Sequence, residues 1–185
     1  MGAVISNVRA TVPARIARRS GQPGPGARRE AMELVILVGV PASGKSSFVR
    51  ARLAATHQHV SQSLQPPARR GDARQRELIP AALRAGRSVV VDNVNATAAI
   101  RAPLIRLGRE HGARIIGYFF PTAVAEAVAR NRHRIAAERV PGVAIYAAAK
   151  RLQPPAPAEG FDEVWEVRLG PDGGFDVTAA PPVGG

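Results

Sequence analysis

The chain contains the stretch Gly39-Val40-Pro41-Ala42-Ser43-Gly44-Lys45-Ser46, which has the form G-x-x-x-x-G-K-[ST] of a phosphate-binding loop. An apolar run at 33–38 leads into this stretch with the length of a buried parallel strand, and residues 47–55 leave it at helical spacing. This strand–loop–helix context is the one that the motif requires. We expect the backbone N–H groups of the loop, together with the N-terminus of the following helix, to hold phosphate groups.

The loop residues predict a nucleotide site. Lys45 is expected to reach the β- and γ-phosphates, and Ser46 to offer its hydroxyl to Mg²⁺. The chain has two lysines, Lys45 and Lys150, among its 26 Lys and Arg residues. A compact ammonium fits between phosphates where a guanidinium fork does not, so the chemistry of the loop explains this lysine. The predicted ATP contacts in the loop are Gly39, Pro41, Ala42, Ser43, Gly44, Lys45, Ser46 and Ser47.

The composition limits the class of protein. A length of 185 residues with 45% hydrophobic content predicts one domain with its own core. The absence of cysteine excludes disulfides, thiolate nucleophiles and Cys-ligated zinc, and no apolar run is long enough to cross a bilayer. We therefore expect a cytoplasmic protein, or a nuclear or organellar one in a eukaryote. The net charge of +12 favours polyanionic partners, although an Arg-rich coding bias is an equal explanation.

The two ends of the chain read as tails. Residues 1–31 are rich in Arg, Pro and Gly and predict a disordered segment, with an organelle transit peptide or a nucleic-acid-binding arm as the alternatives. Residues 32–178 form the predicted domain, and residues 179–185 a loose C-terminal tail.

Strands and helices alternate along the predicted domain. Strands are expected at 33–38, 57–61, 87–92, 113–120 and 161–169, with 175–177 able to form a hairpin with the last of them. Helices are expected at 73–85, 98–111, 123–138 and 143–152. This order predicts an α/β fold with a mostly parallel five-stranded sheet and helices on both of its faces.

A carboxylate follows the strand at 87–92. The strand is apolar and β-branched and ends at Asp92. In proteins with this loop, such an aspartate lies beside the loop and holds Mg²⁺ directly or through water. Capping of the next turn is the alternative role. The predicted metal ligands are therefore Ser46 and Asp92.

At these residues the chain resembles the P-loop kinases of the polynucleotide 5′-hydroxyl kinase type, including the kinase half of the DNA-repair phosphatase/kinases. The resemblance spans about residues 34–167. Four pieces carry it: residues 39–48; Val91-Asp92-Asn93-Val94-Asn95 with Arg101 after it; Arg130-Asn131-Arg132-His133-Arg134 leading to Val140-Pro141; and Pro155 followed by Glu159-Gly160-Phe161.

The resemblance implies a three-layer P-loop NTPase fold with a helical lid. Arg130 and Arg134, expected four apart on one helix face, would close over ATP and neutralise the transferring phosphoryl group. Without the resemblance, a solvated basic helix face is the simpler interpretation. Asn93, Asn95 and Arg101 would support the site from behind the phosphates.

The sequence departs from the family at the residue that accepts the proton of the attacking hydroxyl. The family places an aspartate there in a stretch like His-Val-x-x-Asp, whereas this chain has His59-Val60-Ser61-Gln62-Ser63. Serine is not a general base at neutral pH without help, and Asp72 is the nearest carboxylate in sequence. The candidate catalytic residues are therefore Lys45, Arg134 and Asp72.

The function expected from these residues is transfer of the ATP γ-phosphoryl group to a hydroxyl, with a nucleic-acid 5′-hydroxyl as the first candidate acceptor. ATP and Mg²⁺ are the expected cofactors. The replacement at Ser63 favours a rival hypothesis, an ATP-binding protein with little or no kinase activity. A small-molecule kinase of the same superfamily is a third.

Overall fold

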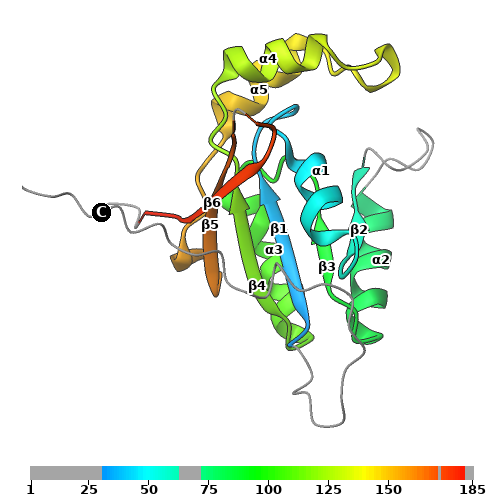
Figure 1. The fold of residues 1–185 in the computed structure, drawn as a ribbon. Helices are drawn as coiled ribbons and strands as arrows, with labels where there is room; N and C mark the ends of the chain where they lie inside the picture. Colours follow the sequence, from blue (N-terminus) through cyan, green and yellow to red (C-terminus); the bar gives the residue numbers. More distant parts are fainter. Residues whose placement is uncertain (1–30, 63–71, 171, 182–185) are drawn as a thin grey trace, which may run out of the picture.

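The central sheet of the computed structural model has six strands, of which β6 alone runs antiparallel to its neighbour. The structure describes residues 31–62, 72–170 and 172–181, without the side chains of residues 72–76. The strand order is β2-β3-β1-β4-β5-β6 (Figure 1). The bounds are β1 Glu33–Val38, β2 Gln58–Val60, β3 Val89–Val91, β4 Arg114–Phe119, β5 Glu163–Leu169 and β6 Phe175–Ala179. The predicted α/β class is confirmed, with five parallel strands and a hairpin strand added at β6.

Strand β1 lies in the middle of the sheet between β3 and β4, and this position explains its apolar residues from Leu34 to Val38. Leu34, Ile36 and Val38 belong to the core on one side of the sheet. Val35 and Leu37 belong to the core on the other side. A parallel strand that is covered on both faces needs apolar side chains at every position, whichever way each one points.

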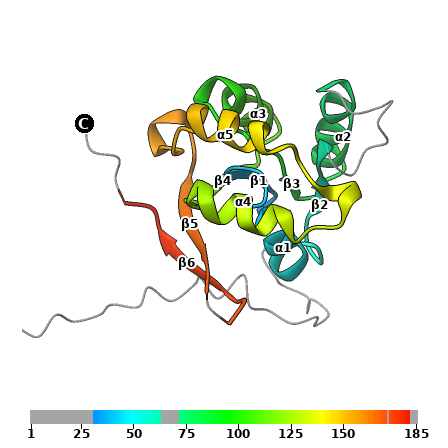
Figure 2. The ribbon, with the colours of Figure 1, turned by 90° about the horizontal axis from the view of Figure 1, so that it is seen from above.

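Helices cover the two faces and make three layers. The helix Lys45–Phe48 (α1) continues as a π-helical turn, Val49–Leu53 (η1), and packs Phe48, Val49 and Leu53 on one face. Helices α2 (Asp72–Arg84) and α3 (Ala98–Glu110) cover the other face. Viewed from above, α1 lies on the opposite side of the strands from α3 (Figure 2).

A lid lies over the carboxyl ends of the parallel strands (Figure 1). It consists of α4 (Val124–Arg132), the 3-10 turn η4 (Ala136–Glu138) and α5 (Gly142–Arg151), and a second 3-10 turn, η5 (Pro157–Glu159), follows on the way to β5. Ala127, Ile145 and Ala148 form a small core with Val40, which belongs to the phosphate-loop motif. The lid is therefore packed directly on the loop beneath it.

The helix expected over 123–138 is wrong at its end. Helix α4 stops at Arg132, and Arg134 lies in the loop beyond it. The Asn131 side chain explains this end, because its Nδ2 donates to the Val140 carbonyl at 2.7 Å and its Oδ1 accepts from the Val140 N–H at 3.0 Å. These two bonds hold a turn that brings the chain back to the helix. Arg130 and Arg134 consequently do not share one helix face.

Within the described part of the chain, no helix is long and apolar enough to span a membrane. The predicted tails at 1–31 and 179–185 lie largely outside the described residues.

Candidate functional site

The loop between β1 and α1 has a backbone that suits phosphate. Ala42 and Gly44 have left-handed backbone conformations, with φ angles of 63° and 100°. Ser43 lies between them and has no positive φ angle, so the two kinds of conformation alternate along the loop. Such alternation forms concavities lined by backbone N–H groups that bind anions. Gly39 is required for packing, because a Cβ there would lie 2.9 Å from the Ser43 Oγ and from the Phe120 Cβ.

Lys45 lies inside this loop. Its Nζ donates to the carbonyl oxygens of Gly39 at 2.9 Å and Val40 at 2.7 Å, and to the Ser43 Oγ at 3.3 Å. Only 6% of the residue is exposed. The three acceptors direct the ammonium toward the interior of the loop, where the motif places the β- and γ-phosphates.

Burial changes the acidity of the ammonium. It lowers the pKa of Lys45 to about 8, against the opposing charge of Asp92, and the positive charge of Arg134 lowers it further. Lys45 is therefore protonated at neutral pH but titrates at moderately alkaline pH.

This pKa makes a prediction about nucleotide affinity. Phosphates favour the charged ammonium, so affinity for Mg·ATP should fall as pH rises through about 8. We expect the dissociation constant to rise several-fold between about pH 7.5 and about pH 9. Titration calorimetry across this range measures it. Lys45→Arg is the control, because a guanidinium stays charged and should give a pH-independent, though weaker, affinity. An equally flat profile for the unmodified protein would contradict the prediction.

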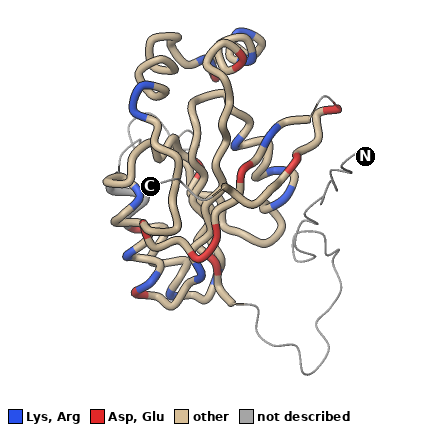
Figure 3. The backbone as a smooth tube through the Cα atoms, turned by 90° about the vertical axis from the view of Figure 1, so that its left-hand side faces the viewer, with Lys and Arg blue, Asp and Glu red and all other residues tan. Residues whose placement is uncertain are grey.

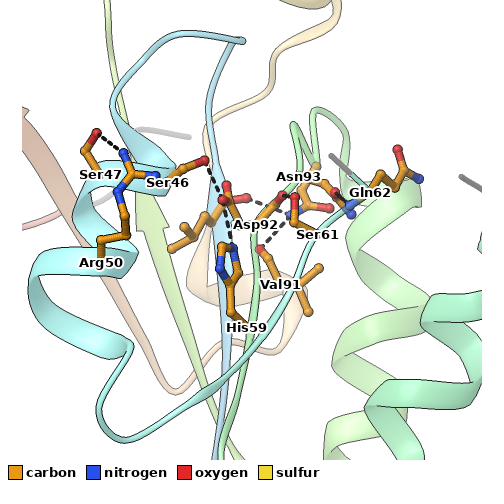
Figure 4. A network of polar contacts seen from close by, with 11 residues as sticks. Ser46, Ser47, Arg50, His59, Ser61, Gln62, Val91, Asp92 and Asn93 are labelled. Carbon is orange, nitrogen blue, oxygen red and sulfur yellow. Dashed lines mark hydrogen bonds and ion pairs between the residues drawn. The ribbon is translucent and has the colours of Figure 1, made fainter. Parts of the chain in front are cut away.

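Ser46, Asp92 and His59 meet beside the loop, at the ends of three different elements (Figure 4). The Ser46 Oγ donates to the Asp92 Oδ2 at 2.6 Å, and the His59 Nε2 lies 3.0 Å from the same oxygen. Burial alone would raise the pKa of Asp92, but the hydrogen bonds from His59 and Ser46 and the charge of Lys45 outweigh it and hold the pKa below its ordinary value. Asp92 is thus a carboxylate at neutral pH.

These donors fit a magnesium ion. Mg²⁺ prefers hard oxygen ligands and is usually held by one or two side chains together with substrate phosphates and water. The Ser46 hydroxyl and the Asp92 carboxylate supply oxygen atoms that could act as metal ligands. These oxygens are already in contact next to the loop. The described residues contain no cluster of three or more His, Cys, Asp or Glu side chains that could hold a metal ion.

The carboxyl ends of β2 and β3 are tied together beside Asp92. The Ser61 Oγ donates to the Asp92 carbonyl at 2.8 Å, and the Gln62 N–H donates to the Asn93 Oδ1 at 3.0 Å (Figure 4). The Asn95 Nδ2 reaches across to β1 and donates to the Leu37 carbonyl at 2.7 Å. These bonds fix the position of Asp92 relative to the loop.

Arg101 supports this arrangement from α3. It is fully buried and pairs with Glu159 through two bonds, Nε to Oε2 at 2.7 Å and Nη2 to Oε1 at 2.6 Å. Its Nη1 donates to the carbonyls of Asn95 and Gln153, each at 3.0 Å. Arg101 therefore joins the loop after β3 to the segment after α5. It lies behind the site and does not line the phosphate loop.

The lid arginines differ in their surroundings. Arg134 acts on the Lys45 ammonium, as its pKa shows, and its Nη1 lies 3.5 Å from the Glu138 carbonyl oxygen. Arg130 pairs with Glu126 through Nη2 at 3.0 Å, while its Nη1 is buried and has no hydrogen-bond partner. A buried guanidinium nitrogen without an acceptor is suited to an anionic ligand.

The structure does not describe the side chains of two predicted residues. Ser63 lies outside the described residues, and Asp72 begins α2 with a side chain that is not described. Ser47 is exposed and accepts a bond from the Arg50 Nη2 at 3.1 Å. The role of Asp72 as a base stays a prediction.

Sequence reasoning missed His59 as a partner of Asp92. The signal was present, because β2 and β3 are parallel neighbours and both end in this region, with His59 opposite Val90. Asp92 lies two residues after Val90, so its side chain is on the same face of the sheet as that of His59.

Comparison with known proteins agrees with this geometry. A family model described as AAA domain matches residues 34–155, which is more than half of the chain. Kti12 of Chaetomium thermophilum, solved in complex with ADP-AlF3, has 16% identity and a TM-score of 0.54 over 73% of this chain and 88% of that chain.

Two other solved structures share the fold. A chain of the Pnkp1/Rnl/Hen1 RNA repair complex has 24% identity and a TM-score of 0.56, over 69% of this chain and 46% of that chain. A fungal RNA kinase has 16% identity and a TM-score of 0.53, over 74% of this chain and 38% of that chain. The chain thus spans less than half of these two proteins. At such identities the likeness shows the P-loop NTPase fold.

Proposed function

Since the chain belongs to the AAA domain family and has a P-loop kinase-like fold, we propose that it is a phosphotransferase that uses ATP and Mg²⁺ to phosphorylate a hydroxyl group. One observation carries the proposal. A buried ammonium lies in the phosphate loop, a serine hydroxyl beside it is bonded to a carboxylate, and the charge of the lid residue Arg134 lowers the pKa of that ammonium. Phosphoryl transfer requires such positioning and charge neutralisation more than covalent chemistry.

The residues divide this work between them. Ser46 and Asp92 would hold Mg²⁺, which when bound neutralises charge on the β- and γ-phosphate oxygens. Lys45 places its ammonium against the same phosphates, and the loop N–H groups orient them. Arg134 is proposed to meet the γ-phosphoryl group from the lid side and to stabilise its charge during transfer. His59 holds the Asp92 carboxylate in place.

Two acceptor classes follow from different observations. A nucleic-acid 5′-hydroxyl is supported by the positive net charge and by the RNA repair and RNA kinase activities that name two of the structural neighbours. A small hydroxyl compound is supported by a cavity beside the loop, lined by Pro41 of the loop and by residues after β3. A protein that binds ATP but transfers slowly is the remaining alternative, supported by Ser63 at the position of the family's general base.

A transfer assay tests the proposal. The protein is incubated with Mg²⁺ and ATP labelled in the γ-phosphate, with and without a 5′-hydroxyl oligonucleotide, and products are separated by size. Label on the oligonucleotide supports the nucleic-acid acceptor. Release of labelled phosphate alone shows a functional nucleotide site that transfers to water and not to the oligonucleotide. Neither product, in a protein that Mg·ATP nonetheless stabilises against heat, would exclude the nucleic-acid acceptor. Absence of both products and of stabilisation by Mg·ATP would contradict the phosphotransferase.

The lid arginine gives a second prediction. Arg134→Gln should lower the rate of ATP turnover about 100-fold, because removal of one preorganised donor to a transition state costs that much. Arg132→Gln is the matched control, since Arg132 is exposed on α4 and should change the rate less than about twofold. Steady-state phosphate release measures both. Equal rates for the two variants would remove Arg134 from the site.

A further inference from the structure

A cavity of about 660 Å³ lies next to the phosphate loop. Its wall includes Pro41 of the loop, residues 93–96 after β3, and side chains of α3 and the lid helix α5. Seen from above, α3 and α5 lie on the same flank of the molecule (Figure 2), and Figure 1 shows α5 in the lid above the level of α3. The volume is that of a pocket for one small molecule. Pro41 belongs to the phosphate loop and Asn93 directly follows Asp92, so the cavity borders both the loop and the predicted metal ligand.

The lining of the cavity is mostly aliphatic. Ile100, Leu104 and Leu107 of α3 face Ala144 and Ala148 of α5 across it. Its side-chain amide groups come from residues that follow β2 and β3. Among them, the Asn95 Nδ2 already donates a hydrogen bond to the Leu37 carbonyl. Arg151 is the one charged residue among the described residues that line the cavity.

This chemistry does not suit a nucleic-acid strand. Binding of polynucleotides depends on several Lys and Arg contacts to phosphates and, for single strands, on bases stacked on aromatic side chains. The described lining offers a single arginine and no aromatic side chain. Figure 3 shows Lys and Arg distributed over several parts of the described chain, including the lid and the opposite end of the sheet.

We propose that the cavity is the acceptor site and that its acceptor is a small hydroxyl compound with an apolar body and at most one anionic group, held by Arg151. This inference rests on the phosphotransferase proposed above. In the transfer, a lone pair of the acceptor hydroxyl forms the bond to the γ-phosphorus of ATP. The bond from that phosphorus to the β–γ bridging oxygen breaks with its electrons left on ADP, and the hydroxyl proton passes to solvent.

A fluorescent probe with this chemistry tests the cavity. The probe 8-anilinonaphthalene-1-sulfonate has an aromatic apolar body and one sulfonate, and its emission reports binding. Ala144→Trp fills the cavity and should weaken binding at least about tenfold. The matched control is Ala147→Trp, an exposed position of the same helix outside the cavity, which should leave binding within about twofold. Arg151→Gln should weaken binding about threefold.

A second pair of variants guards against misfolding of the tryptophan variants. Ile100 is 48% exposed at the cavity and Ile135 is 67% exposed on the lid. Ile100→Glu puts a carboxylate beside the sulfonate and should weaken binding several-fold, whereas Ile135→Glu should not. The proposal is overturned if the probe does not bind, if matched variants behave alike, or if a 5′-hydroxyl oligonucleotide displaces the probe from the unmodified protein.

The same proteins separate this proposal from the one it rests on. Thermal stabilisation by Mg·ATP is measured on each variant alongside probe binding. If Mg·ATP stabilises the protein but the cavity variants do not affect the probe, the acceptor proposal alone fails. If the probe binds as expected but Mg·ATP has no effect on any variant, the phosphotransferase fails and the cavity binds a ligand for another purpose.

Discussion

Replacing Lys45 with methionine is expected to reduce ATP turnover by about 100-fold or more, because the loop then lacks its only ammonium facing the phosphates. Methionine has a similar length and no charge, so the fold should persist. Two effects on stability oppose each other: removal of the buried charge relieves its desolvation, but the carbonyls of Gly39 and Val40 lose the donor that Lys45 supplies. Loss of turnover in a protein that still unfolds cooperatively is therefore the expected pair of results.

The control for this experiment is the other lysine of the chain. Lys150 is exposed on α5 and is outside the residues that line the cavity. Lys150→Met should retain turnover within about twofold of the unmodified protein. Phosphate release and thermal unfolding are measured on both variants. Turnover by Lys45→Met at the level of Lys150→Met would show that the loop is not the phosphate site.

Arg101→Met is expected to have the largest effect on stability, a loss of about 3–5 kcal/mol in the free energy of unfolding. Arg101 is fully buried, and its removal leaves the Glu159 carboxylate without its partner in a side chain that is 15% exposed. It also frees the carbonyls of Asn95 and Gln153, which hold the loop after β3 to the lid. Urea denaturation measures the change.

Two further variants make the result specific. Arg106→Met, on the exposed side of the same helix, should cost less than about 0.5 kcal/mol. The double variant Arg101→Met with Glu159→Leu should be more stable than Arg101→Met alone, because no uncompensated charge is left. A double variant as unstable as Arg101→Met alone, or less stable, would contradict an energetic coupling through this ion pair.

The centre of the fold was predictable from local sequence. The apolar run of β1, the loop after it and the β-branched strand that ends at Asp92 each contain their own signal within a few residues. Parallel strands bring their carboxyl ends to one edge, so Ser46 and Asp92 were expected together and are in contact at 2.6 Å.

Contacts between distant segments were not predictable in the same way. The pairing of Arg101 with Glu159 joins residues 58 positions apart. The local sequence around Arg101 does not indicate that Glu159 is its partner, and the sequence around Glu159 does not indicate Arg101. The resemblance included both residues but gave no reason for their association, which the ion pair now supplies. The end of α4 depends likewise on the hydrogen bonds between Asn131 and Val140. These residues are nine positions apart, so the spacing of residues along a helix does not predict their contact.

The cavity was the least predictable part of the site. Its aliphatic residues on α3 and α5 fit an ordinary amphipathic pattern, so nothing in the sequence separates a side chain that fills the core from one that lines a pocket. Ala144 and Ala148 line the cavity with small side chains, which do not fill the space as larger ones would.

The central claim is that the loop at residues 39–46 binds a nucleoside triphosphate with Mg²⁺. Calorimetric titration of the protein with Mg·ATP tests this claim most directly. We predict one saturable site per chain with a dissociation constant below about 1 mM. Chelation of Mg²⁺ or the change Lys45→Met should weaken this binding at least about tenfold. Absence of saturable binding would contradict the account. An affinity that neither the chelator nor Lys45→Met reduces, relative to the unmodified protein with Mg·ATP, would contradict it as well.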